Sequence, residues 1–182
     1  MLTEKQIVEA VRNGRREGHD AMVAAYAPQV FAMIVRQVSD TMTAQELTQD
    51  TFLKAFRNID SYSVDGARLS TWLCRIAYRL TLDFLKRRRP LIVSLEDSSV
   101  WQTDISDEAL DVELSSGREE RIERLQELMD LLPDEERMLL TLYYFDDLPL
   151  AEIAYVTSIG ENALANRLYR IRKKLYKQLT TI

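Results

Sequence analysis

Residues 150–175 have the sequence LAEIAYVTSIGENALANRLYRIRKKL. Residues 150–156 have the apolar spacing of a short amphipathic helix, and residues 157–160 (TSIG) form a tight connection after it. A longer helix is predicted near residues 161–178, with apolar side chains at intervals of three and four residues. Basic residues form a second stripe on the same helix. The apolar set is Leu164, Leu168, Ile171, Leu175 and Leu179, and the basic set is Arg167, Arg170, Lys174 and Lys177. A helix, a turn and a helix with one apolar and one basic face are typical of a helix-turn-helix DNA-binding unit.

The side chains of the second helix indicate how such a unit would contact DNA. The N-terminal turns of a recognition helix reach base edges, where Asn can pair with adenine and Arg with guanine. Basic residues further along the helix contact phosphates, which position the protein without reading sequence. A solvated basic face on a packing helix remains the alternative, but the preceding helix and turn favour DNA binding. The predicted DNA-contacting residues are Asn162, Ala163, Asn166, Arg167, Arg170, Arg172, Lys173 and Lys174.

The rest of the chain also shows helical periodicity. Upstream helices are predicted at residues 2–12, from Asp20 to about residue 38, at 44–57 and at 69–89, with a loop at 58–68. Pro28 predicts a kink or a local break, and Thr43 with Glu46 predicts a capping box at the next helix. Further helices are predicted near residues 118–131, 134–145 and 149–156. No sustained strand-like alternation occurs, so the fold class is all-α: two small helical domains joined by an acidic linker.

Charge is distributed unevenly along the 182 residues, whose formal net charge is −5. Residues 1–90 hold 14 Lys and Arg against 10 Asp and Glu, whereas residues 91–120 hold 1 against 9. Residues 153–182 are basic again, with 6 against 1. Two basic segments separated by acidic ones fit local contacts with nucleic acid better than a histone-like surface. The predicted domains are 1–90 and 118–182, and the predicted linker is 91–117.

Two surfaces of the N-terminal half contain candidate binding residues. In the helix at 69–89 the apolar stripe is predicted to be Leu69, Leu73, Ile76, Leu80 and Phe84. Trp72, Arg75 and Arg79 are predicted to lie on another face, where an aromatic ring could stack an unpaired base while cations hold the backbone. A core position for Trp72 is the alternative reading. The helix at 44–57 has an outward polar face that contains Glu46, Gln49, Asp50, Leu53 and Arg57.

The composition argues against several classes of protein. One histidine, one cysteine and no Gly-rich phosphate loop leave no constellation for an enzyme, and no metal site or cofactor is expected. Cys74 lies on the helical core pattern and is predicted to be a buried, inert thiol. The start of the chain does not resemble a signal peptide, and no stretch is long and apolar enough to span a bilayer. A cytoplasmic location without membrane insertion is expected.

Three stretches together resemble the extracytoplasmic-function (ECF) group of bacterial RNA polymerase sigma factors. The first is AQELTQDTFLKAF at residues 44–56. The second is LSTWLCRIA at residues 69–77, which continues through LDFL at 82–85. The third runs from Leu132 and Pro133 through Glu152, Ile153 and Ala154 to the basic stretch 167–175. The resemblance covers about residues 20–178. The chain departs from the family pattern at Arg79, where Asn is usual, and at Ser158, where Gly is usual.

The resemblance implies two domains, sigma domains 2 and 4, and a function without catalysis. It implies that Glu46, Gln49, Asp50 and Leu53 dock on the β′ clamp of core RNA polymerase. It implies that promoter DNA at the −10 element is recognised and melted by a second set: Asn58, Asp60, Ser61, Tyr62, Arg68, Trp72, Arg75 and Arg79. The recognition helix would contact the −35 element. The apolar surface around Leu140, Tyr143, Tyr144, Phe145 and Leu148 would partly face the β flap.

The family resemblance also implies regulation by an anti-sigma factor. A stand-alone helix-turn-helix regulator, with residues 1–90 sensing or dimerising, is the alternative function. It predicts tight binding of the free protein to a palindromic site. For the free sigma factor, either a variable separation of the two domains or a compact closed form is expected.

Overall fold

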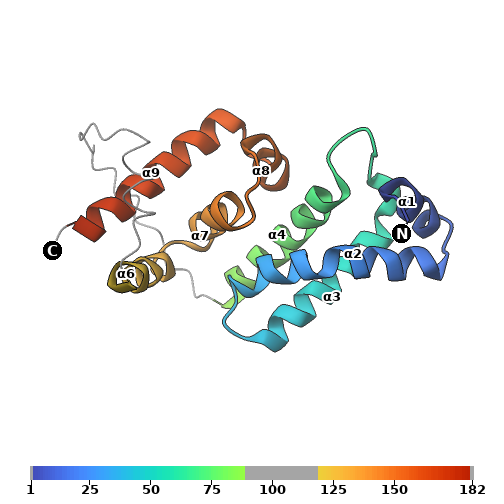
Figure 1. Cartoon of the computed structure of the whole chain (residues 1–182), viewed down its shortest axis with the longest axis horizontal. Helices are drawn as coiled ribbons and strands as arrows, with labels where there is room; N and C mark the ends of the chain where they lie inside the picture. Colours follow the sequence, from blue (N-terminus) through green and yellow to red (C-terminus); the bar gives the residue numbers. More distant parts are fainter. Residues whose placement is uncertain (1, 89–118, 181–182) are drawn as a thin grey trace.

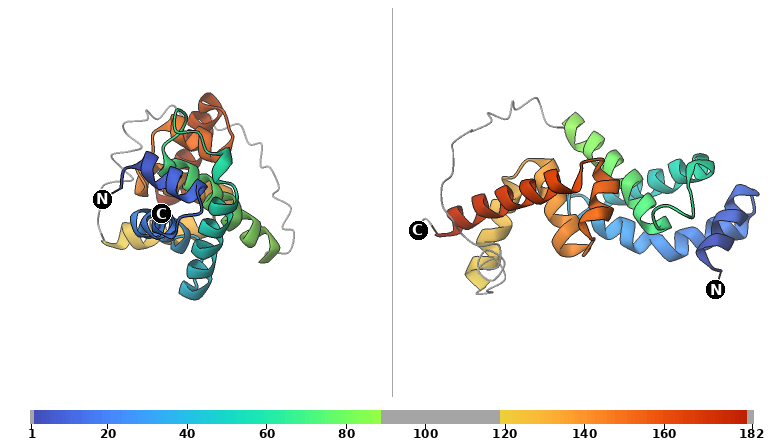
Figure 2. Two further views of the ribbon diagram at one scale, coloured as in Figure 1. Left: turned by 90° about the vertical axis from the view of Figure 1, so that its right-hand side faces the viewer. Right: turned by 90° about the horizontal axis from the view of Figure 1, so that it is seen from above.

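The computed structural model describes residues 2–88 and 119–180, and within these ranges the regular elements are helices without strands. The helices form two groups that lie side by side (Figure 1). Helix α1 and the C-terminal end of α9 lie at opposite ends of the molecule (Figure 2). The N-terminal domain contains α1 (Glu4–Arg12), α2 (Arg16–Val35), α3 (Thr41–Arg57), the short 3₁₀ turn η1 (Ile59–Ser61) and α4 (Leu69–Arg88). The C-terminal domain contains α6 (Glu119–Asp130), α7 (Asp134–Leu140), the π turn η2 (Thr141–Phe145), α8 (Leu150–Thr157) and α9 (Glu161–Thr180). The predicted all-α class is confirmed, while the predicted linker lies outside the described residues.

Local sequence explains where the first helices begin. Thr3 caps α1, and Gln6 completes a capping box. The predicted cap of α3 is wrong, because the helix begins at Thr41 and Asp40 is its cap. The backbone N–H of Thr43 donates to Asp40 Oδ2 at 2.9 Å, and the Thr43 hydroxyl donates to the same oxygen at 2.6 Å. Asp and Thr are both good cap residues, and the carboxylate here takes both donors.

Helix α2 continues through Pro28, so the predicted local break does not occur. Proline removes one hydrogen bond, the one that residue 28 would donate to the carbonyl four residues earlier. That carbonyl belongs to Ala24, and both residues are exposed, so water can reach the orphaned oxygen. The structure thus places the proline on the side of the helix where its missing donor costs least.

The core of the N-terminal domain lies where α2, α3 and α4 meet. Leu69 and Leu73 from the predicted α4 stripe are fully buried, whereas Ile76, Leu80 and Phe84 are only partly buried. Helix α4 has further buried residues that the predicted stripe did not include: Cys74, Ala77, Tyr78 and Leu82. One amphipathic stripe does not account for both sets, so α4 packs on two sides.

The C-terminal domain has the predicted helix-turn-helix, with one difference upstream of it. The predicted helix 134–145 is an α-helix only to Leu140, and its last five residues form a π turn. After α8, Ser158 adopts a left-handed conformation with φ 63°. This conformation favours glycine, which explains why glycine is usual at this position in the family that the sequence resembles.

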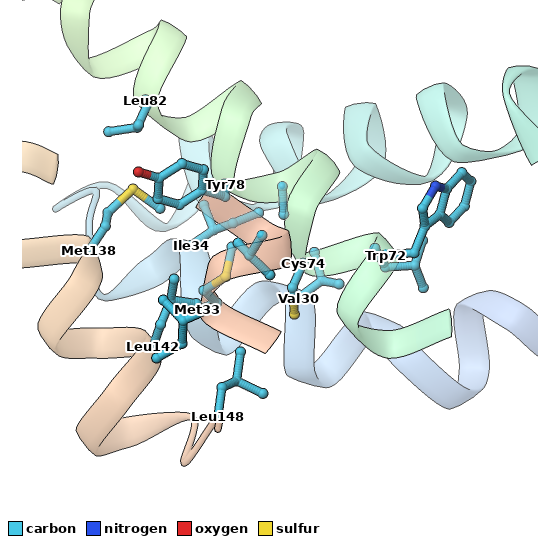
Figure 3. Packing of buried hydrophobic residues seen from close by; sticks show 14 of the residues in the cluster. Val30, Met33, Ile34, Trp72, Cys74, Tyr78, Leu82, Met138, Leu142 and Leu148 are labelled. Carbon is cyan, nitrogen blue, oxygen red and sulfur yellow. The ribbon is translucent and has the colours of Figure 1, made fainter. Parts of the chain in front are cut away.

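The second buried side of α4 faces the C-terminal domain, so the two domains form one closed body. Figure 3 shows Met138 and Leu142 of the C-terminal domain beside Tyr78 and Met33 of the N-terminal domain. A buried polar network crosses the same boundary. Gln37 Nε2 donates to Thr141 Oγ1 at 2.7 Å, and Arg137 Nε donates to Gln37 Oε1 at 3.1 Å. Of the two expected arrangements, the structure has the compact closed form.

Candidate protein and nucleic-acid interfaces

Helix α3 divides cleanly into a buried face and an exposed face. Ala44, Leu47, Phe52 and Ala55 are buried against the domain core. The exposed face contains the four residues predicted to bind core polymerase, Glu46, Gln49, Asp50 and Leu53. Leu53 is 51% exposed although it is a large apolar residue. An exposed leucine among carboxylate and amide side chains is a common composition for a protein-docking surface.

The loop before α4 is held in place by the first helix. Arg12 donates to the carbonyl oxygens of Ile59, at 3.4 Å, and Tyr62, at 2.5 Å. The Tyr62 hydroxyl donates to Glu4 Oε1 at 2.5 Å. Burial and the neighbouring Glu4 carboxylate raise the pKa of Tyr62 above its ordinary value. Tyr62 therefore fixes the loop.

Three other predicted loop residues are accessible. Asn58, Asp60 and Ser61 are exposed. The Ser61 hydroxyl donates to the Asn58 carbonyl, and the Asn58 amide donates to the Lys54 carbonyl, so the backbone of this turn is fixed. The loop can present these side chains to a ligand on a stable frame.

Trp72 occupies the core position that the sequence left as the alternative. It is 6% exposed, and its ring centroid lies 5.4 Å from that of Tyr62. The prediction that Trp72 shares an outward face with Arg75 and Arg79 is wrong for this closed form. The cause is local: Tyr62 at the end of η1 packs over the first turn of α4 and covers the indole.

The basic residues at the start of α4 all meet the C-terminal domain. Arg68 pairs with Glu152 of α8, and the Thr71 hydroxyl donates to the other oxygen of the same carboxylate. Arg75 lies over the ring of Tyr155, with its guanidinium carbon 4.8 Å from the ring centroid. The Ser158 hydroxyl accepts from Arg75 at 3.2 Å and from Arg79 at 3.4 Å. We call this set of hydrogen bonds, the ion pair and the cation–π contact the α4–α8 contact.

The recognition helix α9 presents most of its predicted DNA-contacting residues to solvent. Asn162, Ala163, Asn166, Arg170 and Lys174 are exposed. Their positions follow from the apolar face of α9, whose Leu164, Leu168, Ile171 and Leu175 are buried. A helix placed in this way can be inserted in a major groove without unpacking the domain.

Three basic residues of α9 are less accessible than predicted. Arg172 is 6% exposed, so its guanidinium is not available to a phosphate in this conformation and the predicted contact is wrong for it. It lies four residues after Leu168 and three before Leu175, both core residues, which places it toward the domain rather than on the outer stripe. Lys173 lies over the Tyr169 ring, 5.7 Å from its centroid, and is half-buried. Arg167 donates to Glu135 Oε2 at 3.1 Å.

Glu135 links the two predicted DNA-binding domains. One of its oxygens pairs with Lys86 Nζ of α4 at 3.1 Å, and the other pairs with Arg167 of α9. Partial burial raises the pKa of Glu135, but hydrogen bonds and charge from Lys86 and Arg167 outweigh this effect and hold it below the ordinary value. The carboxylate is thus ionised at neutral pH and neutralises a cation from each domain.

The apolar surface predicted to face the β flap is partly accessible. Tyr144 and Phe145 are 42% and 55% exposed, Tyr143 is half-buried, and Leu140 and Leu148 belong to the core. Arg36 of the N-terminal domain lies over the Phe145 ring at 5.3 Å and pairs with Asp146 at 2.9 Å. The closed form therefore covers one edge of this surface.

Cys74 is buried as predicted, with 1% of its surface exposed. Burial raises the pKa of its thiol to about 12, with smaller contributions from Asp146 and Glu152 of the C-terminal domain. No group of three metal-ligating side chains occurs in residues 2–88 and 119–180. Across the same ranges, no helix combines the length and apolarity needed to cross a bilayer.

The sequence singled out only some of the residues that join the domains. It gave a role to Arg68, Arg75 and Arg79, but none to Glu152, Arg137 and Gln37. Arg137 is 8% exposed and Gln37 6% exposed, although both are polar. The one local signal is at Arg137, which directly precedes the apolar residues Met138, Leu139 and Leu140. The partners of the three residues lie about eighty to a hundred positions away, where local sequence patterns are not informative.

Comparison with known proteins identifies both domains. Residues 22–90 match the family model Sigma-70 region 2, and residues 122–175 match Sigma-70, region 4. The chain is 28% identical to the ECF RNA polymerase sigma factor SigW of Bacillus subtilis, over 98% of this chain and 97% of the relative. It is 31% identical to the RNA polymerase sigma-H factor of Pseudomonas aeruginosa, over 98% and 96%.

Solved structures show the same fold. The structure of CnrH in complex with the cytosolic domain of CnrY matches with a TM-score of 0.66 and 20% identity, over 97% of this chain and 96% of that one. The sigma factor RpoE of Bartonella quintana, in complex with the anti-sigma factor NepR, matches with a TM-score of 0.61 and 18% identity, over 89% and 96%. With both sigma regions matched in order and full-length relatives in the same group, the chain belongs to the ECF group of RNA polymerase sigma factors.

Proposed function

We propose that this sigma factor binds core RNA polymerase through the exposed face of α3 and directs it to promoters as a binding subunit without catalytic activity. The observation that supports this most is the accessibility of Glu46, Gln49, Asp50 and Leu53, which stay exposed even in the closed form. A docking face that remains free while Arg68, Arg75 and Arg79 are engaged by α8 allows polymerase to bind first.

Promoter recognition is divided between the domains. The loop residues Asn58, Asp60 and Ser61, with Arg68, Arg75 and Arg79, would contact the −10 element. Trp72 and Tyr62, both buried, would support this surface from beneath. In domain 4, the exposed residues at the start of α9 would contact bases of the −35 element, and Lys173 and Lys174 would contact phosphates. The β flap would meet Tyr144 and Phe145.

An anti-sigma factor is the proposed regulator, and the cytoplasm is the proposed location. The support is indirect: of two solved structures with this fold, one is CnrH in complex with the cytosolic domain of CnrY, and the other is the sigma factor RpoE in complex with the anti-sigma factor NepR. Domain boundaries at residues 1–90 and 118–182 belong to the same proposal, with 91–117 as the linker.

Co-purification with core RNA polymerase tests the polymerase contact. The test variant is Asp50→Arg with Gln49→Ala, and the matched control is Glu9→Arg with Gln29→Ala, which changes an exposed carboxylate and an exposed amide on α1 and α2. Wild type and control should be retained by core polymerase, and the test variant should be lost. If all three are retained equally, the assignment of α3 is wrong. If the wild type does not bind core polymerase but binds a palindromic duplex tightly, the chain functions as a stand-alone helix-turn-helix regulator instead.

A further inference from the structure

Helix α8 presents to α4 three kinds of group that a nucleotide also presents. Both oxygens of the Glu152 carboxylate accept hydrogen bonds, one from Arg68 and one from Thr71. The Tyr155 ring offers its face to the guanidinium of Arg75. The Ser158 hydroxyl, at the end of α8, accepts from Arg75 and Arg79.

The chemistry of these three groups corresponds to that of a DNA strand. A carboxylate with both oxygens bonded offers the acceptors of a phosphodiester, and an aromatic face stacks on guanidinium as a base does. A hydroxyl oxygen is an acceptor like the sugar oxygens. The cations that α8 engages are Arg68, just before α4, and Arg75 and Arg79 of α4, the same cations that the proposed function assigns to promoter DNA.

We propose that α8 of domain 4 occupies the promoter-binding surface of α4 as an intramolecular substitute for a DNA strand, so that the free sigma factor is autoinhibited. The proposal rests on the proposed function of this surface, because the contact inhibits only if DNA uses the same cations. DNA and α8 would then compete for one surface, and the domains must separate before the −10 element can bind.

A second set of contacts holds the domains together away from the DNA surface. The Arg137 guanidinium is buried at the boundary and is bonded to Gln37 Oε1 and Asp134 Oδ1, at 3.1 and 3.0 Å. Gln37 alone among these comes from domain 2. Replacing Gln37 by alanine removes one acceptor from the buried Arg137 guanidinium, and this loss is costly only in the closed form. The replacement therefore shifts the equilibrium between the closed and open forms toward the open form.

Glu135 adds an ion pair across the domain boundary. This glutamate of α7 pairs with Lys86 of α4 and, within its own domain, with Arg167 of α9. Closure therefore engages Lys86, whereas the Glu135–Arg167 pair does not depend on closure. The closed form leaves the exposed start of α9 and the polar face of α3 accessible.

Cys74 provides a built-in reporter of this opening. It is the single cysteine of the chain, and it lies on α4 between Thr71 and Tyr78, on the side that faces domain 4. The carboxylates that act on its thiol, Asp146 and Glu152, both belong to domain 4. In the closed form the thiol is 1% exposed, so alkylation requires separation of the domains.

The test compares the full-length wild type with Glu152→Gln, with Gln37→Ala and with the double variant. Glu9→Gln is the matched control, since it neutralises an exposed glutamate on α1. Two quantities are measured for each protein without polymerase: the rate at which iodoacetamide alkylates Cys74, and the affinity for a fluorescein-labelled single-stranded 20-mer of randomised sequence. Adding Arg75→Ala to the double variant tests whether any bound DNA uses α4.

The expected result is that the double variant is alkylated about tenfold faster or more, and binds the oligonucleotide about tenfold more tightly, than wild type and control. That size corresponds to the loss of one charge-assisted hydrogen bond. Arg75→Ala should then remove the gain in affinity. Alkylation that stays at the wild-type rate in all variants would overturn the proposed contact. If Cys74 of the double variant is alkylated faster but the affinity for the oligonucleotide is unchanged and still depends on Arg75, autoinhibition is overturned. The α4–α8 contact and the proposed DNA surface would then both stand. Affinity that does not depend on Arg75 would instead refute the proposed DNA surface, and the inference with it.

Discussion

Gly18 is a point of close approach between α1 and α2, and its replacement by alanine is a quantitative test of that packing. A Cβ at this position would lie 2.6 Å from Ala10 Cβ and 2.7 Å from the backbone nitrogen of Val11. Non-bonded carbons rest at ~3.5–4.0 Å, so the first contact is about 1 Å too short. Because backbone atoms of α1 are among those contacted, no side-chain rotation relieves the clash.

The cost of Gly18→Ala follows from two opposing effects. Overpacking of a core costs about 1–3 kcal/mol, and a contact with backbone belongs in the upper part of this range. Alanine is the better helix former by about 1 kcal/mol, which offsets part of the cost. We expect the free energy of unfolding to fall by about 1–2 kcal/mol.

Urea unfolding followed by circular dichroism measures this change. Gly66→Ala is the matched control, because the nearest atom to its new Cβ would be Ser63 O at 3.4 Å, an ordinary contact. The control should stay within about 0.5 kcal/mol of wild type. A Gly18→Ala protein as stable as wild type would refute the close approach of the two helices.

Three further predictions concern single side chains. Arg172→Ala should lower the free energy of unfolding by about 1–3 kcal/mol in urea titrations, while Lys174→Ala should not, because only Arg172 is buried. Trp72→Ala should lower the free energy of unfolding by about 3–5 kcal/mol in the same assay, because a core tryptophan is removed. An unchanged free energy of unfolding would show that Trp72 is not a core residue. Glu135 has a lowered pKa, so its contacts contribute stability that is complete above the ordinary carboxylate pKa and is lost as the pH falls through the folded value. Urea midpoints of wild type should therefore decline below about pH 5 more steeply than those of Glu135→Gln.

Local sequence patterns predicted the helices well because each depends on neighbouring residues. The apolar intervals of α9 and the tight connection before it correspond to the observed helix and turn. The start of α3 was misplaced because Asp40 and Thr43 are both acceptable cap residues. Sequence alone does not show which side-chain oxygen accepts the hydrogen bond from the first backbone N–H groups of the helix. The π turn at residues 141–145 was missed because its apolar spacing fits an α-helix equally well.

Interactions between the domains could not be predicted in the same way. The burial of a second side of α4, with Cys74 and Tyr78, cannot be predicted until the surface that packs against it is known. Arg68, Arg75 and Arg79 look like free cations in the sequence, but in the fold each meets a group on α8. Such contacts join residues about eighty positions apart, so only a three-dimensional structure reveals them.

Transcription with purified core RNA polymerase tests whether this chain directs promoter-specific initiation. The measurement maps the 5′ ends of transcripts made from a genomic plasmid library, with and without this chain. A sigma factor should give new, discrete start sites that share two upstream elements at a constant spacing, and the variant Asp50→Arg, Gln49→Ala should lose them. If the chain, folded and added in excess, produces no start site that core polymerase alone does not produce, it does not direct initiation.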